Sequence, residues 1–164
     1  DQVYRVTANS PSQVTTTGAS IGVNYYLNNS FMLSGNYSYN VLAKTDKNDP
    51  IIPAFNTPEH KYNVGLTGRE FNGKLGPVNL KYAGFNVTYK WIEGFLFEGS
   101  PQFTGTIPTY DMLDAQVNYR VPKIKTTFKL GASNILNKMN YQTYGGPQIG
   151  RMAYFSALVE LNKL

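Results

Sequence analysis

Acidic side chains stand close together at two places in the sequence. One place holds Asp111 and Asp114, and the other holds Glu93 and Glu98. Two carboxyl groups facing one substrate can act as general acid and nucleophile, as they do in glycoside hydrolases. The residues around these pairs show no pattern of a substrate pocket, so charge on a loop or on a wet surface is the favoured interpretation.

Metal and phosphate chemistry have little support in the sequence. The chain has one histidine, His60, and no cysteine. His60 follows Glu59 at the start of an expected strand, where a hydrogen-bonding role is favoured over metal ligation. The glycines near Gly145 lack the Lys-Ser/Thr pair and the following helix of a phosphate-binding loop. No catalytic residue, cofactor or metal is therefore expected, and the protein is not expected to be an enzyme.

Composition points to an all-β protein with aromatic belts. Charged residues make up 15% of the 164 residues and aromatic residues 14%, with 13 tyrosines. A soluble domain usually has about 25% charged residues. Lys and Arg are scattered despite the net charge of +5, so no nucleic-acid partner is expected. The opening DQVYRVTANS lacks the plan of a signal peptide. We expect that a signal was removed or that the sequence starts inside a longer protein.

Alternation of apolar and polar residues predicts a series of antiparallel strands. Seven segments alternate, at 15–27, 31–41, 60–69, 79–93, 110–121, 124–135 and 153–161. An eighth, at 3–7, is ambiguous. In the second segment, Leu33 and Tyr37 share one face, while Ser34 and Asn36 share the other. A soluble sheet would expose Lys and Glu on its polar face. Small uncharged polar groups instead indicate lipid on one side and a wet or plugged lumen on the other.

The connections between these segments alternate in length. They are short at 28–30 and 121–123, moderate at 70–78, and long at 42–58, 94–108 and 136–150. Outer-membrane barrels have short periplasmic turns and long extracellular loops, so the same orientation is predicted here. Two aromatic girdles should flank the aliphatic middle of the wall. They comprise Tyr25 and Tyr119 near the short turns, and Tyr39, Tyr62, Tyr89, Trp91 and Phe155 toward the long loops.

Two further groups of residues are candidates for contacts with other molecules. Aromatic residues in the long loops could stack on a ligand, pack the loops together, or touch an accessory lipoprotein. They are Phe95, Phe97, Phe103, Tyr141 and Tyr144. Cationic residues predicted to point inward could contact a plug or line a solvated lumen. They are Lys61, Arg69, Lys90, Arg120, Lys125 and Lys129.

Four stretches together resemble a known family. They are NTPEHKYNVGLTGRE (56–70), GFLFEGSPQFTGTIPTYDMLDAQVNYRVP (94–122), TTFKLGASNILNK (126–138) and YGGPQIGRMAYFSALVEL (144–161). They are similar to the C-terminal barrel of TonB-dependent outer-membrane receptors, above all the Bacteroidota type, including SusC-like receptors and those with carboxypeptidase-regulatory-like domains. The most specific part is G-x-x-N-(I/L)-(L/F)-N-K followed by Y-x-x-Y-G-G-P-x-x-G-R, over 131–151.

This resemblance implies a segment of seven to eight strands from an antiparallel transmembrane barrel of about 22 strands. All of 1–164 would belong to that one barrel domain, roughly its last third. The plug domain and the TonB box are absent from this sequence and would precede it. The implied function is import of a glycan, peptide or metal chelate into the periplasm. The implied partners are outer-membrane lipid, the rest of the barrel and its plug, the TonB complex, and a surface-exposed lipoprotein.

Two other interpretations stay open at this point. One is a complete eight-stranded outer-membrane barrel used for adhesion or structure, which should fold alone. The other is a secreted β-sandwich that binds glycans, in which the apolar faces would form a dry core.

Overall fold

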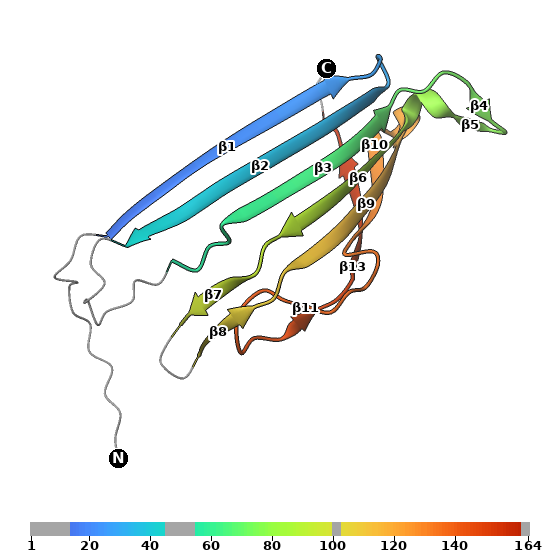
Figure 1. The fold of residues 1–164 in the computed structure, drawn as a ribbon. Helices are drawn as coiled ribbons and strands as arrows, with labels where there is room; N and C mark the ends of the chain where they lie inside the picture. The colour runs from blue at the N-terminus through green and yellow to red at the C-terminus, as the bar shows by residue number, and fades with distance from the viewer. Residues whose placement is uncertain (1–13, 45–54, 100–102, 162–164) are drawn as a thin grey trace.

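The computed structural model describes residues 14–44, 55–99 and 103–161. Seven long strands form one antiparallel sheet (Figure 1). They are β1 (Val14–Tyr26), β2 (Phe31–Lys44), β3 (His60–Arg69), β6 (Ala83–Ile92), β9 (Tyr110–Val121), β10 (Thr126–Ser133) and β13 (Met152–Val159). Their order in the sheet follows the chain, so each strand pairs with the next long strand. The predicted all-β antiparallel fold is confirmed.

Three short hairpins extend from the two ends of the sheet. They are β4 with β5 (Lys74–Leu75, Val78–Asn79), β7 with β8 (Phe95–Glu98, Thr104–Ile107) and β11 with β12 (Asn140–Tyr141, Gln148–Ile149). The segment 94–108, predicted to be a loop, is therefore partly a hairpin. The ambiguous strand at 3–7 lies outside the described residues.

Two predicted strands begin later than the alternation suggested. The strand expected from residue 79 starts at Ala83, because Leu80–Tyr82 form the 3-10 helix η1, capped by Asn79 Oδ1 accepting from the Lys81 amide at 3.1 Å. The strand expected from residue 124 starts at Thr126, because Pro122–Ile124 form a second 3-10 helix, η2. Lys125 then adopts a left-handed conformation, with φ of 48°. Neither of these helices, in the described part of the chain, has the length and apolar character that crossing a bilayer requires.

The predicted tight turn after β1 is held by an asparagine side chain. Asn28 Oδ1 accepts from the amides of Ser30 at 2.8 Å and Phe31 at 2.9 Å. This side-chain bond to the following backbone is the reason asparagine favours tight turns.

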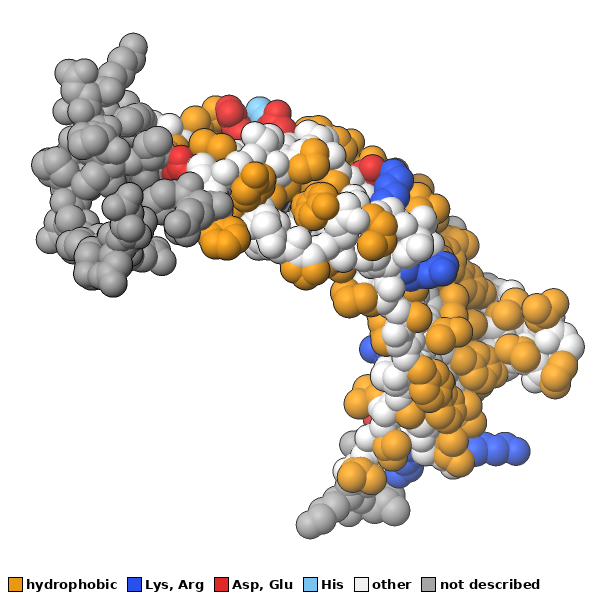
Figure 2. Space-filling model, turned by 90° about the horizontal axis from the view of Figure 1, so that it is seen from below, with side chains coloured by type: hydrophobic (Ala, Val, Ile, Leu, Met, Phe, Trp, Pro, Cys, Tyr) orange, Lys and Arg blue, Asp and Glu red, His pale blue; other side chains and the backbone are white. Residues whose placement is uncertain are grey.

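The strand register sorts side chains onto two faces, because directly paired residues lie on the same side of a sheet. Leu33 pairs with Leu66, and Leu66 with Val87. At the adjacent positions of the same strands, Thr67 pairs with Asn86, and Asn86 pairs with Gln116. We call the apolar side the outer face and the polar side the inner face. Figure 2 shows the sheet as an open arc with hydrophobic side chains gathered along its convex side.

The apolar residues of the outer face are not covered. Among the described residues Ile107, at 1% exposure, is the sole hydrophobic residue that counts as buried. Val117, Leu130 and Phe155 on the outer face are 55%, 57% and 68% exposed. The seven strands form one sheet and not two packed sheets, so the β-sandwich alternative is not what the structure shows.

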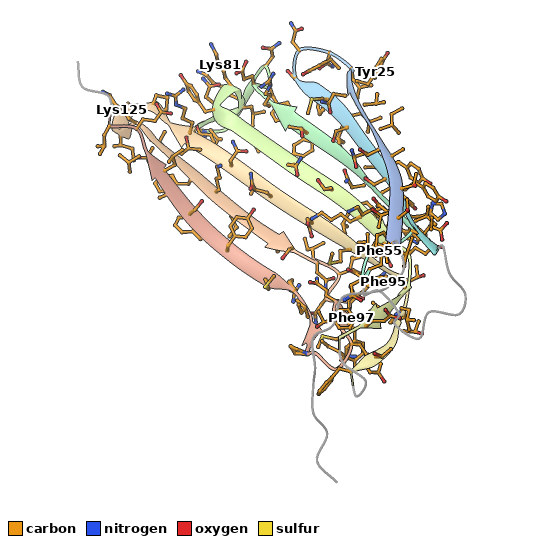
Figure 3. The ribbon with its side chains drawn as sticks, turned by 90° about the vertical axis from the view of Figure 1, so that its left-hand side faces the viewer. Tyr25, Phe55, Lys81, Phe95, Phe97 and Lys125 are labelled. Atoms are coloured by element: carbon orange, nitrogen blue, oxygen red, sulfur yellow. The ribbon has the colours of Figure 1, made fainter. Side chains whose placement is uncertain are left out.

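The sheet has two rims. The short-turn rim carries the connections at 27–30, 70–82 and 122–125, with Tyr25, Lys81 and Lys125 at the same end of the sheet (Figure 3). The long-loop rim at the opposite end carries Phe55, Phe95 and Phe97 (Figure 3), together with the connection at 134–151.

Candidate functional site

The inner face is a hydrogen-bonded polar wall. Asn86 Nδ2 donates to Thr67 Oγ1 at 2.9 Å, and Thr88 Oγ1 donates to Asn86 Oδ1 at 3.1 Å. Farther along the sheet the Tyr154 hydroxyl donates to Gln116 Oε1 at 2.7 Å. Gly131 lies between them, and a Cβ at this position would collide with the Tyr154 ring. Such a surface is suited to water or to a polar protein surface, and not to lipid tails.

An ion pair interrupts this uncharged wall. Lys90 Nζ lies 2.6 Å from Asp114 Oδ2, and the two side chains are 41% and 23% exposed. The other oxygen, Asp114 Oδ1, accepts from the Asn134 amide at 2.9 Å. Both residues border a niche of about 250 Å³ on the inner face. Asp114 therefore ties the wall to the connection that begins at Asn134.

The two aspartates first considered as a catalytic pair lie on opposite faces. Asp111 pairs in register with Trp91 on the outer face, while Asp114 pairs with Thr88 on the inner face. Asp111 binds Lys138 Nζ through both oxygens, at 2.7 and 2.6 Å. Each carboxylate has its own lysine, so the two cannot share one substrate. Their interpretation as wall and loop charges fits this geometry.

Asn134 organises the connection after β10. Its side chain donates to the Lys138 carbonyl at 2.6 Å and accepts from the Lys138 amide at 3.1 Å. It is 2% exposed, with φ of 49°. Asn137, at φ of 56°, accepts from the Arg151 amide at 2.9 Å. Sequence reasoning did not single out these roles, although the paired asparagines of the ASNILNK motif were a signal.

The predicted loop aromatics divide between a cleft and contacts among loops. Phe95 lines a cleft of about 460 Å³ at the long-loop rim, together with Phe55, Glu59 and Glu93. The Tyr144 ring lies against Gly105 of β8, and the Phe103 ring lies against Gly145. These two residues therefore pack the β7–β8 hairpin on the 134–151 connection. Tyr141 is 42% exposed, and Phe97 contacts Gly99 within its own hairpin.

A second asparagine orders the same rim. Asn56 Nδ2 donates to the Glu98 carbonyl at 3.0 Å, and Asn56 Oδ1 accepts from the Glu98 amide at 2.6 Å. Glu93 Oε2 accepts from the His60 amide at 3.0 Å. The Glu93 side chain thus binds the start of β3, whereas Glu98 is bound by Asn56 through its backbone. His60 Nδ1 lies 2.6 Å from the Tyr37 hydroxyl, and no group of three possible metal-binding side chains occurs in the described ranges.

The other predicted inward cations have different settings. Arg120 Nη2 lies 2.9 Å from Glu160 Oε2. Lys61, Arg69 and Lys129 lie on the inner face, paired in register with Ser38, Gly84 and Asn118. The placement of Lys125 on the wall was wrong, because it belongs to the turn before β10 at the short-turn rim (Figure 3). Contact of any of these residues with a plug stays a prediction.

Aromatic rings form two groups on the outer face. Near the long-loop rim, Tyr62 stacks on Trp91 with centroids 5.3 Å apart and lies 6.3 Å from Tyr89. Tyr39 lies 5.1 Å from His60. Phe155 lies midway along β13, opposite Leu130, and its place in this group stays a prediction. Phe155 stacks on Phe128, near the start of β10, with ring centroids 6.0 Å apart. Tyr119, nearer the short-turn rim, contacts Tyr82 edge-on at 6.5 Å.

Comparison with known proteins gives one family and a set of structural relatives. The family described as "TonB dependent receptor-like, beta-barrel" matches residues 1–137. No curated protein matches the chain. The match to the family ends before most of the 131–151 motif that was the most specific part of the sequence resemblance.

Two solved structures, one of P. aeruginosa FpvA and one of an FpvAI complex, resemble the sheet. FpvA in complex with the heterologous pyoverdine Pvd(ATCC13535) and Fe has a TM-score of 0.62 at 14% identity, covering 88% of this chain and 19% of that chain. The FpvAI–pyocin S2 complex has a TM-score of 0.61 at 15% identity, with the same coverage of 88% and 19%. These identities indicate a shared fold, and this chain spans about one fifth of the length of either relative. The family match over residues 1–137, more than half of the chain, shows that the chain belongs to the TonB-dependent receptor β-barrel family.

Proposed function

We propose that this chain forms part of the wall of a TonB-dependent transporter in the bacterial outer membrane, and that it carries out no bond chemistry. The observation that carries the proposal is the separation of the faces. Across β3, β6 and β9 the register places Leu66, Val87 and Val117 on one side and Asn86, Gln116 and Asn118 on the other. An exposed apolar band opposite a polar wall matches the lipid and lumen faces of outer-membrane barrels.

In this proposal the short-turn rim faces the periplasm and the long-loop rim faces the exterior. Turns on the periplasmic side of such barrels are short, and extracellular loops are longer. The polar inner face would surround a plug domain from a segment outside these 164 residues, and that segment would contact TonB. The niche beside Lys90 and Asp114 offers hydrogen-bonding groups to a plug.

The proposed cargo is a nutrient captured at the long-loop rim, either a glycan, a peptide or a metal chelate. The FpvA relative is described as a complex with pyoverdine and Fe, which supports the metal chelate among these classes. The cleft beside Phe95 supplies an aromatic ring together with two carboxylates, Glu59 and Glu93. The motif at 131–151 supports a receptor of the Bacteroidota, SusC-like type, in which a surface lipoprotein would cover the same rim.

Orientation is tested by labelling single cysteines in whole cells, because this chain has no cysteine of its own. Leu75 in the β4–β5 hairpin is 71% exposed, and Met139 in the 134–151 connection is 56% exposed. A membrane-impermeant maleimide should label Met139→Cys in intact cells. It should label Leu75→Cys only after the outer membrane is permeabilised. The reverse pattern would overturn the orientation.

The intact mass of the native protein, extracted from membranes in detergent, tests the transporter itself. A mass several times 18.3 kDa is expected for a large receptor that carries this sequence near its C-terminal end. A mass close to 18.3 kDa would contradict the transporter and favour the small eight-stranded barrel.

A further inference from the structure

An apolar groove crosses the outer face beside the short-turn rim. It has a volume of about 440 Å³ and runs across β6, β9, β10 and β13. Phe71 and Phe85 form one wall, with their rings stacked at 6.0 Å, and Phe128 and Phe155 form the other, also at 6.0 Å. Val117, which is 55% exposed, lies between them. The volume lies within the range of small-molecule sites, and the walls are almost entirely hydrocarbon.

The groove reaches the short-turn rim at η1, and two turns of this rim carry lysines. Leu80 of η1 lines the groove, and η1 is held on β9 by the contact of Tyr82 with Tyr119 at 6.5 Å. Lys81 follows Leu80 directly. Lys125 closes η2, the turn that follows β9. Figure 3 shows Lys81 and Lys125 at the same rim of the sheet.

These lysines have no acidic partner to neutralise them. Neither Lys81 nor Lys125 forms an ion pair within the described residues. The rim also carries Glu70 and Glu160, of which Glu160 is already bound to Arg120 at 2.9 Å. Lys74 and Lys123 add further positive charge. The end of the groove is therefore positively charged and open to solvent.

We propose that the groove binds one phospholipid, with an acyl chain between the two phenylalanine pairs and the headgroup phosphate at Lys81 and Lys125. The inference rests on the proposed function, which places this rim at the level of the headgroups in the periplasmic leaflet. An acyl chain fits an apolar groove on a surface already facing lipid, and lysines near a membrane surface attract anionic headgroups.

The combination of the two features selects a phospholipid over simpler ligands. A free phosphate would be attracted by the lysines and would gain nothing from the groove. A neutral hydrocarbon would fill the groove and gain nothing from the lysines. We therefore expect that tight binding requires an acyl chain and a phosphate group in the same molecule.

Native mass spectrometry of the full-length protein, purified from membranes in detergent and stripped of lipid, tests this site. The probes are dioleoylphosphatidylglycerol, dioleoylglycerol and glycerol phosphate. We expect one tightly bound phosphatidylglycerol and much weaker binding of the other two. Equal binding of phosphatidylglycerol and dioleoylglycerol would overturn the phosphate site.

Two variants with matched controls separate the parts of the site. Lys81→Glu with Lys125→Glu is expected to weaken binding roughly thirtyfold or more, because about 1 kcal/mol of attraction for anionic lipid is lost at each lysine and repulsion is added. The control, Arg151→Glu, reverses a charge at the long-loop rim, away from the groove. Val117→Phe fills the groove and should weaken binding about tenfold or more, while Val64→Phe, on the outer face outside the groove, should not.

The outcomes also distinguish this inference from the proposed function. If either variant binds phosphatidylglycerol as its control does, the lipid site is wrong and the transporter stands. If the wild-type protein is recovered from the aqueous fraction and not from membranes, both proposals are wrong.

Discussion

Replacing Asn134 by alanine should release the 134–151 connection from the wall. The buried side chain makes two short hydrogen bonds to the Lys138 backbone, at 2.6 and 3.1 Å. Its backbone has φ of 49°, a conformation that asparagine adopts more readily than alanine. The substitution therefore removes hydrogen bonds and adds conformational strain at the same residue.

The size of the effect follows from these two terms. A backbone group left without its partner costs about 1–3 kcal/mol, and the low end applies because the Lys138 residue is exposed. Two such groups cost about 2 kcal/mol, and left-handed alanine adds about 1 kcal/mol. A total of about 3 kcal/mol corresponds to roughly a hundredfold increase in opening of the connection, since about 1.4 kcal/mol is a factor of ten.

Hydrogen exchange of the full-length protein in detergent measures that opening directly. Peptides covering 134–151 should exchange about a hundredfold faster in Asn134→Ala, while peptides from β2 and β3 keep their rates. Asn29→Ala is the matched control. Asn29 is an exposed turn residue at the opposite rim, and its side chain makes no hydrogen bond within the described part of the chain.

A small effect would refute the reasoning. If exchange over 134–151 rises less than about threefold in Asn134→Ala, the connection is not held by this side chain. Equal acceleration in β2 and β3 would show loss of the whole fold and would equally contradict a local role.

Two further substitutions test the faces and the loop packing. Val64→Lys on the outer face should destabilise the protein refolded in lipid vesicles by about 2–4 kcal/mol, as measured by urea titration. Asn36→Lys on the inner face should have little effect. Equal losses of stability in the two variants would contradict the assignment of faces. Gly105→Ala places a Cβ on the Tyr144 ring and should loosen the β7–β8 hairpin by about 1–3 kcal/mol. Limited proteolysis should then cut the loop of this hairpin faster than in the wild-type protein. Gly35→Ala is the control and should have no effect, because a Cβ at Gly35 meets nothing within 4 Å.

Strand positions could be predicted from the sequence because alternation is a local property. The predicted bounds of β3 and β9 match the structure. The β7–β8 hairpin was missed because FLFEGSPQFTGTIP is rich in glycine and proline. The hairpin is also supported from a distance, by Asn56 bonding the Glu98 backbone at 3.0 and 2.6 Å.

The parts of the site that depend on register could not be predicted in this way. The stacking of Phe155 on Phe128 could not be predicted, because it depends on the pairing of β10 with β13. Asp111 and Asp114 look like a pair in the sequence, yet their odd spacing along a strand places them on opposite faces. The partners of Asn134 and Asp114 lie in different strands and loops, and sequence spacing does not reveal them.

The order of the strands has a consequence for how the sheet forms. Each long strand pairs with the long strand that precedes it, so the ladder can grow by one hairpin at a time. Every step closes only the connection between two neighbouring strands, and the entropic cost of closing a loop grows slowly with its length. The 13-residue β1 and the strand β13 at the other end keep one free edge each within the described sheet. A free edge of this length is a template for another strand. Any strand that pairs with one of these two edges therefore protects the sheet from edge-to-edge aggregation.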